Sequence, residues 1–288
     1  MLARPRILWD YSRMNKLTTE KRAQVLRCIV EGNSLRATSR LTDVAINSVV
    51  KLLIDAGNAC SKFQDETLRN LPCKRVQCDE IWSFVGAKER NIPTEEKGKG
   101  RGDVWTWTAI DAETKLVPCW YIGNRDAEAA YHFMHDLAGR LANRVQMTTD
   151  GHRPYLQAVE DAFGTEIDYA QLVKIYGKSY NNTPEARYSP AQCMGARKAK
   201  VIGKPVYAHV STSICERNNL NMRMGMRRFT RLTNAFSKKV ENLEHNVALY
   251  FMHYNFCRIH TSLRVTPAME AGVADHVWSL EEVVALLD

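Results

Sequence analysis

Cysteine pairs at metal-binding spacing are missing from this sequence. None of its eight cysteines belongs to a Cys-x-x-Cys pair, and Cys73 and Cys78 have no second pair that would complete a zinc site. Scattered cysteines in a chain without a secretion signal favour reduced, mostly buried thiols. We therefore expect a cytoplasmic protein without a structural zinc.

Long hydrophobic runs are also missing. No apolar stretch approaches the roughly 20 residues of a transmembrane helix, and the first residues lack the apolar core and cleavage site of a signal peptide. These absences argue against membrane insertion and secretion. Met14 opens a more typical start than Met1, so we expect residues 1–14 to be an extension without structure.

Acidic residues are outnumbered by basic ones. The 288-residue chain carries a formal net charge of +8 and has a pI of about 9.1. A basic balance of this size favours a polyanionic partner, with nucleic acid first and an anionic membrane surface second. A hydrophobic content of 45% is enough to fill a real core.

Residues 15–60 predict a compact helical unit. Apolar positions at helical spacing indicate helices over 20–30, from Ser34 to about Leu41, and over 45–56, where Gly57 would end the third helix. Two short helices joined by a tight turn are typical of a helix-turn-helix, and any three-helix packing module is the alternative. If this unit is a helix-turn-helix, the exposed face of its DNA-reading helix carries Asn47, Ser48 and Lys51. Residues 61–74 would be a linker.

The pattern changes to strands and helices in alternation from residue 75. Three strands, a helix, a strand, a helix and a strand are the element order of an RNase H-like α/β fold. We therefore expect a catalytic domain over residues 75–270, with an irregular insertion at about 176–208, and a tail with a short helix over 271–288. The predicted strands are 76–85, 104–110, 116–122, 145–149 and 169–175, and the helices between them are 127–141 and 153–163.

Three acids lie where a two-metal phosphoryl-transfer enzyme needs them. Asp79 and Asp150 lie on or at the end of predicted strands, and Glu216 opens a predicted helix. Two divalent cations require several hard oxygen ligands that converge on one point, and strand ends facing a helix can provide them. Arg223 lies two helical turns after Glu216, so both side chains project from one face of that helix. His209 and His152 could add contacts to a proton or a phosphate.

Each of these residues also has an ordinary structural interpretation. A single Asp at a strand end is commonly a turn or cap residue. Glu80 and Asp111 are competing acids, but Glu80 points to the opposite sheet face from Asp79, and Asp111 suits a hairpin turn. Arg217 and Arg223 could simply form a solvated face. The tryptophans of the predicted strands are better explained as core residues than as platforms for bases.

Three strings that occur in order along the chain resemble one known family. They are Cys78–Val85 (CDEIWSFV), the Thr149–Gly151 turn, and Ile214–Arg223 (ICERNNLNMR) followed by Arg231–Lys239 (RLTNAFSKK). Together they resemble the IS-one (insertion sequence one) family of DDE transposases, over residues 15 to 270. The segment from Tyr254 to Leu263 is similar to the end of many integrase-type transposase domains.

The resemblance implies both the fold and the site. It implies an RNase H-like (retroviral integrase-like) domain behind a helix-turn-helix that binds the inverted repeats of the element. It places Asp79, Asp150 and Glu216 as ligands of two Mg²⁺ or Mn²⁺ ions, with His209 and Arg223 as active-site neighbours. It also implies a homodimer or larger assembly in the bacterial cytoplasm, associated with the nucleoid when bound to DNA.

The basic tract from Arg197 to Lys239 holds eleven Lys or Arg and one acid. Candidate DNA contacts are Asn47, Ser48, Lys51, Arg217, Arg223, Arg227, Arg228, Arg231, Lys238 and Lys239.

Three functions fit these features. An insertion-sequence transposase would bind terminal inverted repeats, cut them and transfer the strands. A domesticated or inactive transposase would bind DNA as a repressor without cutting it. A nuclease would cut other DNA without joining it. The presence of all three acids favours the first.

Overall fold

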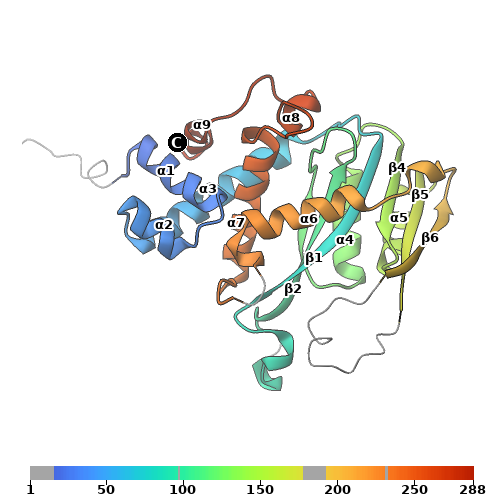
Figure 1. Ribbon diagram of the computed structural model, residues 1–288, viewed down its shortest axis with the longest axis horizontal. Helices are drawn as coiled ribbons and strands as arrows, with labels where there is room; N and C mark the ends of the chain where they lie inside the picture. Colours follow the sequence, from blue (N-terminus) through green and yellow to red (C-terminus); the bar gives the residue numbers. More distant parts are fainter. Residues whose placement is uncertain (1–15, 97, 178–192, 231–232) are drawn as a thin grey trace, which may run out of the picture.

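The computed structural model describes residues 16–96, 98–177, 193–230 and 233–288. It contains one six-stranded mixed sheet, in the order β3-β2-β1-β4-β5-β6. The sheet lies to one side of the N-terminal helices, with β5 and β6 at the far end (Figure 1). Strand β2 is antiparallel to both of its neighbours, β1 and β3. Strands β4 and β5 are parallel to β1, and the edge strand β6 is antiparallel to β5. The mixed α/β class predicted from the sequence is confirmed. The strands are β1 (Arg75–Val85), β2 (Gly102–Asp111), β3 (Trp120–Gly123), β4 (Val145–Asp150), β5 (Ile167–Tyr176) and β6 (Cys193–Ile202).

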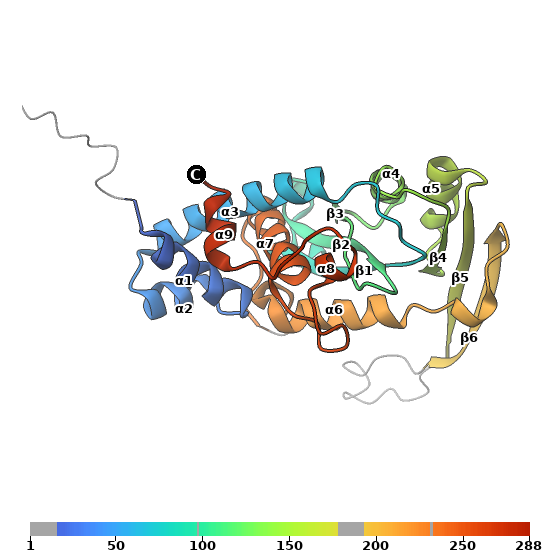
Figure 2. The same ribbon diagram turned by 90° about the horizontal axis from the view of Figure 1, so that it is seen from above.

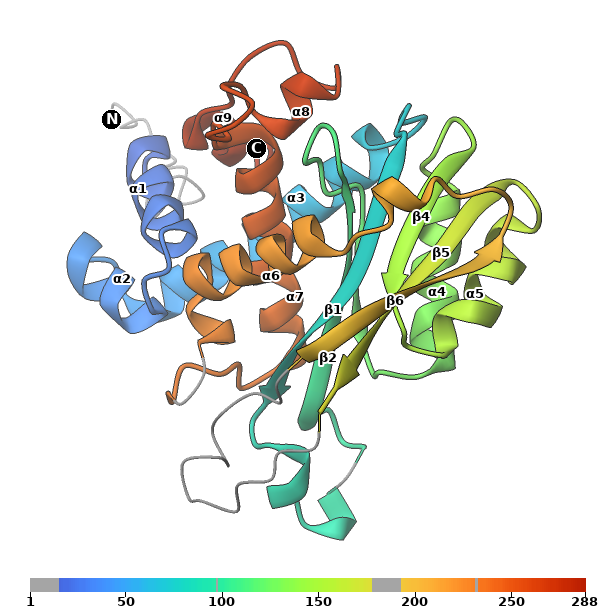
Figure 3. The same ribbon diagram turned by 45° about the vertical axis from the view of Figure 1, so that its right-hand side comes forward.

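Helices cover both faces of this sheet (Figure 3). On one face, α4 (Ala127–Ala138) and α5 (Pro154–Phe163) pack in a buried cluster that includes Trp107 and Tyr155. On the other, α6 (Ser213–Gly225) and α7 (Val240–Met252) form a second cluster with Ile81 of β1. Burial of these apolar side chains at about 25 cal/mol per Å² drives the layers together. The same packing places α6 beside β1.

The N-terminal helices are α1 (Thr19–Val30), α2 (Leu35–Thr42) and α3 (Ile46–Thr67). The side chains of Thr18 and Ser34 accept hydrogen bonds from backbone N–H groups in the first turns of α1 and α2, so both are N-caps. Their interpretation as a helix-turn-helix stays a prediction. The chain returns to α1 through α8 (Pro267–Glu270) and α9 (Leu280–Ala285) (Figure 2).

The predicted end of the third helix at Gly57 is wrong. α3 continues for ten more residues, to Thr67, through part of the segment predicted to be a linker. Gly57 is buried against α7, and a Cβ at this position would lie only 2.4 Å from the Cβ of His245. The glycine therefore permits a close crossing of two helices, although it normally weakens a helix interior.

Two strand predictions also differ from the structure. Strand β3 begins at Trp120 rather than at residue 116, because Pro118 has no N–H to donate and Val117 binds the side chain of Asn255 instead. Within the expected irregular insertion, residues 193–202 form the edge strand β6. Nearly all of its residues are exposed, so it lacks the apolar alternation by which a strand is recognised. Residues 1–14, Arg231 and most of the remaining insertion lie outside the described residues.

Candidate active site

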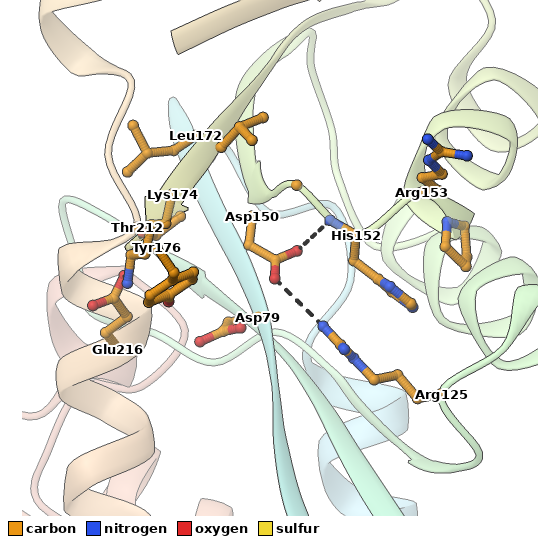
Figure 4. Close-up of a pocket in the computed structure, with 13 residues that line it drawn as sticks. Asp79, Arg125, Asp150, His152, Arg153, Leu172, Lys174, Tyr176, Thr212 and Glu216 are labelled. Atoms are coloured by element: carbon orange, nitrogen blue, oxygen red, sulfur yellow. Dashed lines mark hydrogen bonds and ion pairs between the residues drawn. The ribbon is translucent and has the colours of Figure 1, made fainter. Parts of the chain in front are cut away.

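Asp79 and Asp150 lie side by side at the ends of neighbouring strands. The parallel pairing of β1 with β4 joins Cys78 to Thr149, so the next row across the sheet holds the two aspartates. Asp79 faces α6 and Asp150 ends β4, and both line one cavity of about 670 Å³. Figure 4 shows Asp79 between Asp150 and Glu216. The juxtaposition depends on the register between two strands whose aspartates are 71 positions apart in the sequence.

Both oxygens of the Asp79 carboxylate are held in place. The backbone N–H of Glu80 donates to Oδ1 at 2.9 Å, and Nδ2 of Asn219 on α6 donates to Oδ2 at 2.8 Å. Burial raises the pKa of Asp79 to about 7, and the neighbouring carboxylates of Glu80 and Asp150 add to this increase. Near neutral pH the group is therefore poised between its protonated form and the charged form that a cation would favour.

Asp150 is partly exposed, with 30% of its side-chain surface accessible to solvent. The backbone N–H of His152 donates to its Oδ1 at 2.9 Å, and Nη2 of Arg125 lies 3.5 Å from its Oδ2 (Figure 4). Arg125 also donates from Nε to Oε1 of Glu80 at 2.6 Å, and its guanidinium stacks on the ring of Trp105 at 4.9 Å. A single arginine therefore links two of the acids at this sheet edge.

Glu216 approaches the cavity from the opposite side, on the first turn of α6. Its Oε1 accepts hydrogen bonds from Nζ of Lys174 at 2.7 Å and from Oγ1 of Thr212 at 2.5 Å. The helix itself is anchored to β1, because Oε1 of Gln77 accepts the N–H groups of Ile214 and Cys215 at 2.9 and 3.1 Å. Gln77 thus satisfies two helix N-terminal donors that would otherwise be buried without a partner.

Glu80 is closer to the aspartates than its sheet face suggested. Its side chain does lie on the opposite face, where it accepts a hydrogen bond from the hydroxyl of Tyr155 on α5 at 3.0 Å. However, one carboxylate oxygen from each of Asp79, Glu80 and Asp150 lies within 4.8 Å of the others. Strand β4 ends at Asp150, so the edge of β1 beside Glu80 is open and carboxylates from both faces can converge there. Burial raises the pKa of Glu80, and Arg125 opposes that increase.

This donor set suits a hard divalent cation. Carboxylate oxygens are the ligands that Mg²⁺ and Mn²⁺ prefer, and Asp79, Asp150 and Glu216 all reach one cavity. Asn219 adds a buried amide oxygen without a hydrogen-bond partner close to Asp79. The three carboxylates whose oxygens lie close enough together to share one ion are those of Asp79, Glu80 and Asp150. Glu216 is not among them, because its side chain is turned toward Lys174.

Two residues expected beside the acids do not line the cavity. His209 is exposed, and its Nδ1 lies 2.7 Å from Nη1 of Arg75 at the start of β1. Arg223 lies two turns beyond Glu216 on α6, and it is not among the described residues that line the cavity. His152 does line it, and its ring packs against Trp107 and Tyr155.

The residues expected to contact DNA have different environments. Asn47, Ser48 and Lys51 are exposed on the first turns of α3, although Lys51 pairs with Asp55 at 2.5 Å. Arg228 is instead turned inward, where it donates to the side chains of Asn246 and Ser237 at 3.1 and 2.8 Å. Burial lowers its pKa to about 10. These contacts of Arg228 stabilise the fold, and its predicted contact with DNA stays a prediction. Arg217, Arg227, Lys238 and Lys239 are exposed, and Arg231 lies outside the described residues.

Four residues of this site were missed from the sequence: Gln77, Arg125, Lys174 and Asn219. Asn219 follows Glu216 by three positions, which places both on one helix face, so helical spacing could have identified it. Gln77 precedes Asp79 by two positions on β1 and shares its face, so strand alternation could have identified it too. Arg125 lies in a loop and Lys174 on a distant strand, and no local pattern connects either with the acids.

A family comparison bears directly on this geometry. Residues 97–204 match a family model described as a DDE domain, in the group named for the transposase of insertion sequence IS240. The chain is a DDE-type polynucleotidyl transferase. The matched stretch includes Asp150, and it supports a DDE transposase of an insertion sequence without assigning it to the IS-one family. No curated protein matches the chain.

Two solved structures were found to be similar to this enzyme only at a distance. One is the piggyBac transposase synaptic complex with hairpin DNA, with 10% sequence identity, a TM-score of 0.39, and coverage of 96% of this chain and 72% of that chain. The other is the Mos1 strand transfer complex, with 12% identity, a TM-score of 0.24, and coverage of 82% of this chain and 77% of that chain.

Among the helices in the described part of the enzyme, none is long and apolar enough to cross a membrane.

Proposed function

We propose that this enzyme is the transposase of an IS-one-like insertion sequence. It would bind the terminal inverted repeats of the element, cut the DNA at their ends and join those ends to target DNA. The observation that carries the proposal is the convergence of Asp79, Asp150 and Glu216 on one cavity that residues of the matched DDE domain largely line. The CDEIWSFV and ICERNNLNMR strings, which lie outside the matched residues, support the IS-one-like assignment.

In this proposal, Asp79, Asp150 and Glu216 would hold two Mg²⁺ or Mn²⁺ ions. When bound, the ions would activate the attacking oxygen and stabilise the leaving oxygen of an in-line displacement. The protein prepares the ligands for this role. Asn219 and the Glu80 N–H orient the Asp79 carboxylate, and Gln77 fixes the start of the helix that carries Glu216.

Arg125 and Lys174 balance the negative charge of this site. Arg125 contacts Glu80 and Asp150, and Lys174 contacts Glu216. Without such partners, several carboxylates in one partly buried cavity would repel one another and become protonated. Lys174 also lines the cavity, where its ammonium group could meet a phosphate of the DNA backbone. DNA would enter from the open side of the cavity.

Binding of DNA would involve the exposed face of α3, helix α6 and the basic segment after it. Asn47, Ser48 and Lys51 would read the inverted repeats, and Arg217, Arg227, Lys238 and Lys239 would contact phosphates. Two ends must be held together during transposition, so we propose a homodimer or larger assembly on DNA.

A strand-transfer assay tests this function. Purified enzyme, labelled terminal-repeat DNA and Mg²⁺ should give cleaved and joined products, and Asp150→Asn should give neither while it keeps DNA binding. Cleavage without joining would indicate a nuclease. DNA binding by the wild-type enzyme with neither reaction would indicate the repressor alternative.

A further inference from the structure

A row of residues crosses the sheet from the catalytic acids to its outer edge. Asp150 on β4 pairs with Leu172 on β5, and Leu172 pairs with Lys198 on β6. Residues paired directly across neighbouring strands share one face of the sheet. Lys198 therefore stands two strands from Asp150, which is about 10 Å at the usual strand spacing.

The same face carries further positive charge. Leu172, Lys174 and Tyr176 alternate along β5 and line the catalytic cavity, and Val173 between them also borders it. The register places Lys198 beside Leu172 and Lys200 beside Ala170, so both β6 lysines face the same way as the cavity-lining residues. Both are exposed, and β6 contains no acidic residue, while Asp168 of β5 is the acid that interacts with Lys200 and is itself paired with Arg144. The result is a cationic surface, formed by Lys174, Lys198 and Lys200, that begins at the cavity and ends at the edge of the sheet.

Figure 2 places β5 and β6 at the end of the molecule opposite α1 and α2. The candidate helix-turn-helix and this cationic surface are therefore separate, and one stretch of DNA bound to the helices need not touch β6 of the same chain. Lys198 is also held in place, because its Nζ donates to the carbonyl oxygen of Tyr207 at 2.5 Å. Residues 207–212 lead directly into α6 and Glu216.

We propose that Lys198 and Lys200 bind the phosphate backbone of DNA next to the phosphate that reacts. This inference rests on the proposed function and adds a binding surface to it. Residues two apart on a strand are about 6.6 Å apart, a spacing that suits neighbouring phosphates along one DNA strand. Charge complementarity selects DNA over a second protein copy, because lysines on an edge strand disfavour pairing with another strand.

Arg197 provides a matched control for this proposal. It is an exposed cation next to Lys198, but it pairs with Val173 and therefore lies on the opposite face of β6. Binding of a fluorescent terminal-repeat duplex is measured by anisotropy with Ca²⁺ in place of Mg²⁺, over a series of salt concentrations. Lys198→Ala and Lys200→Ala should each weaken binding about three- to tenfold and reduce the salt slope by about 0.9. Arg197→Ala should change neither, and Lys198→Arg should restore both.

Four results would overturn the proposal. Equal losses in Arg197→Ala and Lys198→Ala would show that overall charge matters and not this face. Unchanged affinity together with a smaller mass by light scattering would assign β6 to an interface between copies. Unchanged affinity and mass in both lysine variants would remove β6 from DNA binding and leave the proposed function intact. A wild-type enzyme without affinity for the duplex would contradict the inference and the proposed function together.

Discussion

Among the carboxyl groups of this site, Asp79 is the one whose ionisation depends most on its surroundings. Its pKa is raised to about 7 by burial and by neighbouring carboxylates, and the protonated carboxyl is a poor metal ligand. We expect the apparent Mn²⁺ affinity of the enzyme to fall roughly tenfold for each pH unit below about 7. Calorimetric titration between pH 6 and 8 measures this. Equal affinity across that range would contradict the assignment of Asp79 as a ligand.

The same pKa has a consequence for stability. Because the folded pKa of Asp79 lies above the ordinary value of 3.8, the folded protein retains this proton over a pH range in which the unfolded chain has released it. The metal-free enzyme should therefore lose stability as pH rises from about 4 to about 7. Asp79→Asn should reduce that loss, and thermal melts over this range would show it. A pH dependence that is identical in the two proteins would contradict the prediction.

Asn219 is expected to act through Asp79. Its amide donates to the Asp79 carboxylate, and loss of such an outer contact typically costs ten- to a hundredfold in metal affinity. Asn219→Ala should therefore weaken Mn²⁺ binding by about that factor, and strand transfer should fall with it.

Asn218 is the matched control for this prediction. It is the neighbouring residue on α6, it is also buried, and within the described structure its side chain makes no hydrogen bond. Asn218→Ala should leave Mn²⁺ affinity within about twofold of wild type. Equal losses in the two variants would indicate a general effect on α6 rather than orientation of Asp79.

At the scale of elements, the crossing of α3 and α7 depends on the absence of a side chain at position 57. Ala is the better helix former by about 1 kcal/mol, but a Cβ here would meet the backbone and Cβ of His245. We expect Gly57→Ala to destabilise the enzyme by about 1–3 kcal/mol, as overpacking usually does. Urea unfolding measures this, with Asn58→Ala on the exposed side of α3 as the control. A more stable Gly57→Ala protein would show that the two helices can move apart at little cost.

Elements with a strong local pattern were predicted well. Strand β4 and helix α5 have apolar residues at the period of their structure, and they form within one residue of the predicted bounds. Strand β6 was missed because hydrogen bonds to β5 stabilise it, while nearly all of its side chains are in solvent. The predicted end of the third helix was too early. The sequence does not distinguish a glycine that permits a close tertiary contact, as Gly57 does, from a glycine that ends a helix.

At the scale of the whole molecule, the C-terminal segment connects the N-terminal helices to the rest of the enzyme. Trp278 packs against Phe63 of α3 and Phe256 after α7, with ring centroids 4.8 and 5.8 Å apart. Arg22 of α1 pairs with Asp288 at 2.9 Å. Buried side chains from α1, α3 and the sheet belong to one continuous apolar cluster. We therefore expect the described parts to unfold together.

Trp278→Ala tests this cooperativity. The lost packing should cost about 2–3 kcal/mol, less than for a fully buried tryptophan because Trp278 is partly exposed. That cost corresponds to a fall of several degrees in the unfolding midpoint. Circular dichroism and calorimetry should still give a single transition. Two separate transitions in the wild-type enzyme would show that the N-terminal helices fold independently.

The sequence by itself determined the local features of this enzyme: its helices and most strands, its positive charge, and the three acids of the candidate site. These are readable because periodicity, turn chemistry and residue type act over a few neighbouring positions. Only the tertiary structure decided which side chains meet. Strand register brings Asp150 beside Asp79 and Lys198 into the same row, and the docking of α6 on β1 brings Asn219 to Asp79. The contact between Asn219 and Asp79 joins residues 140 positions apart. No local pattern records such contacts, because their free energy comes from packing between elements rather than within them.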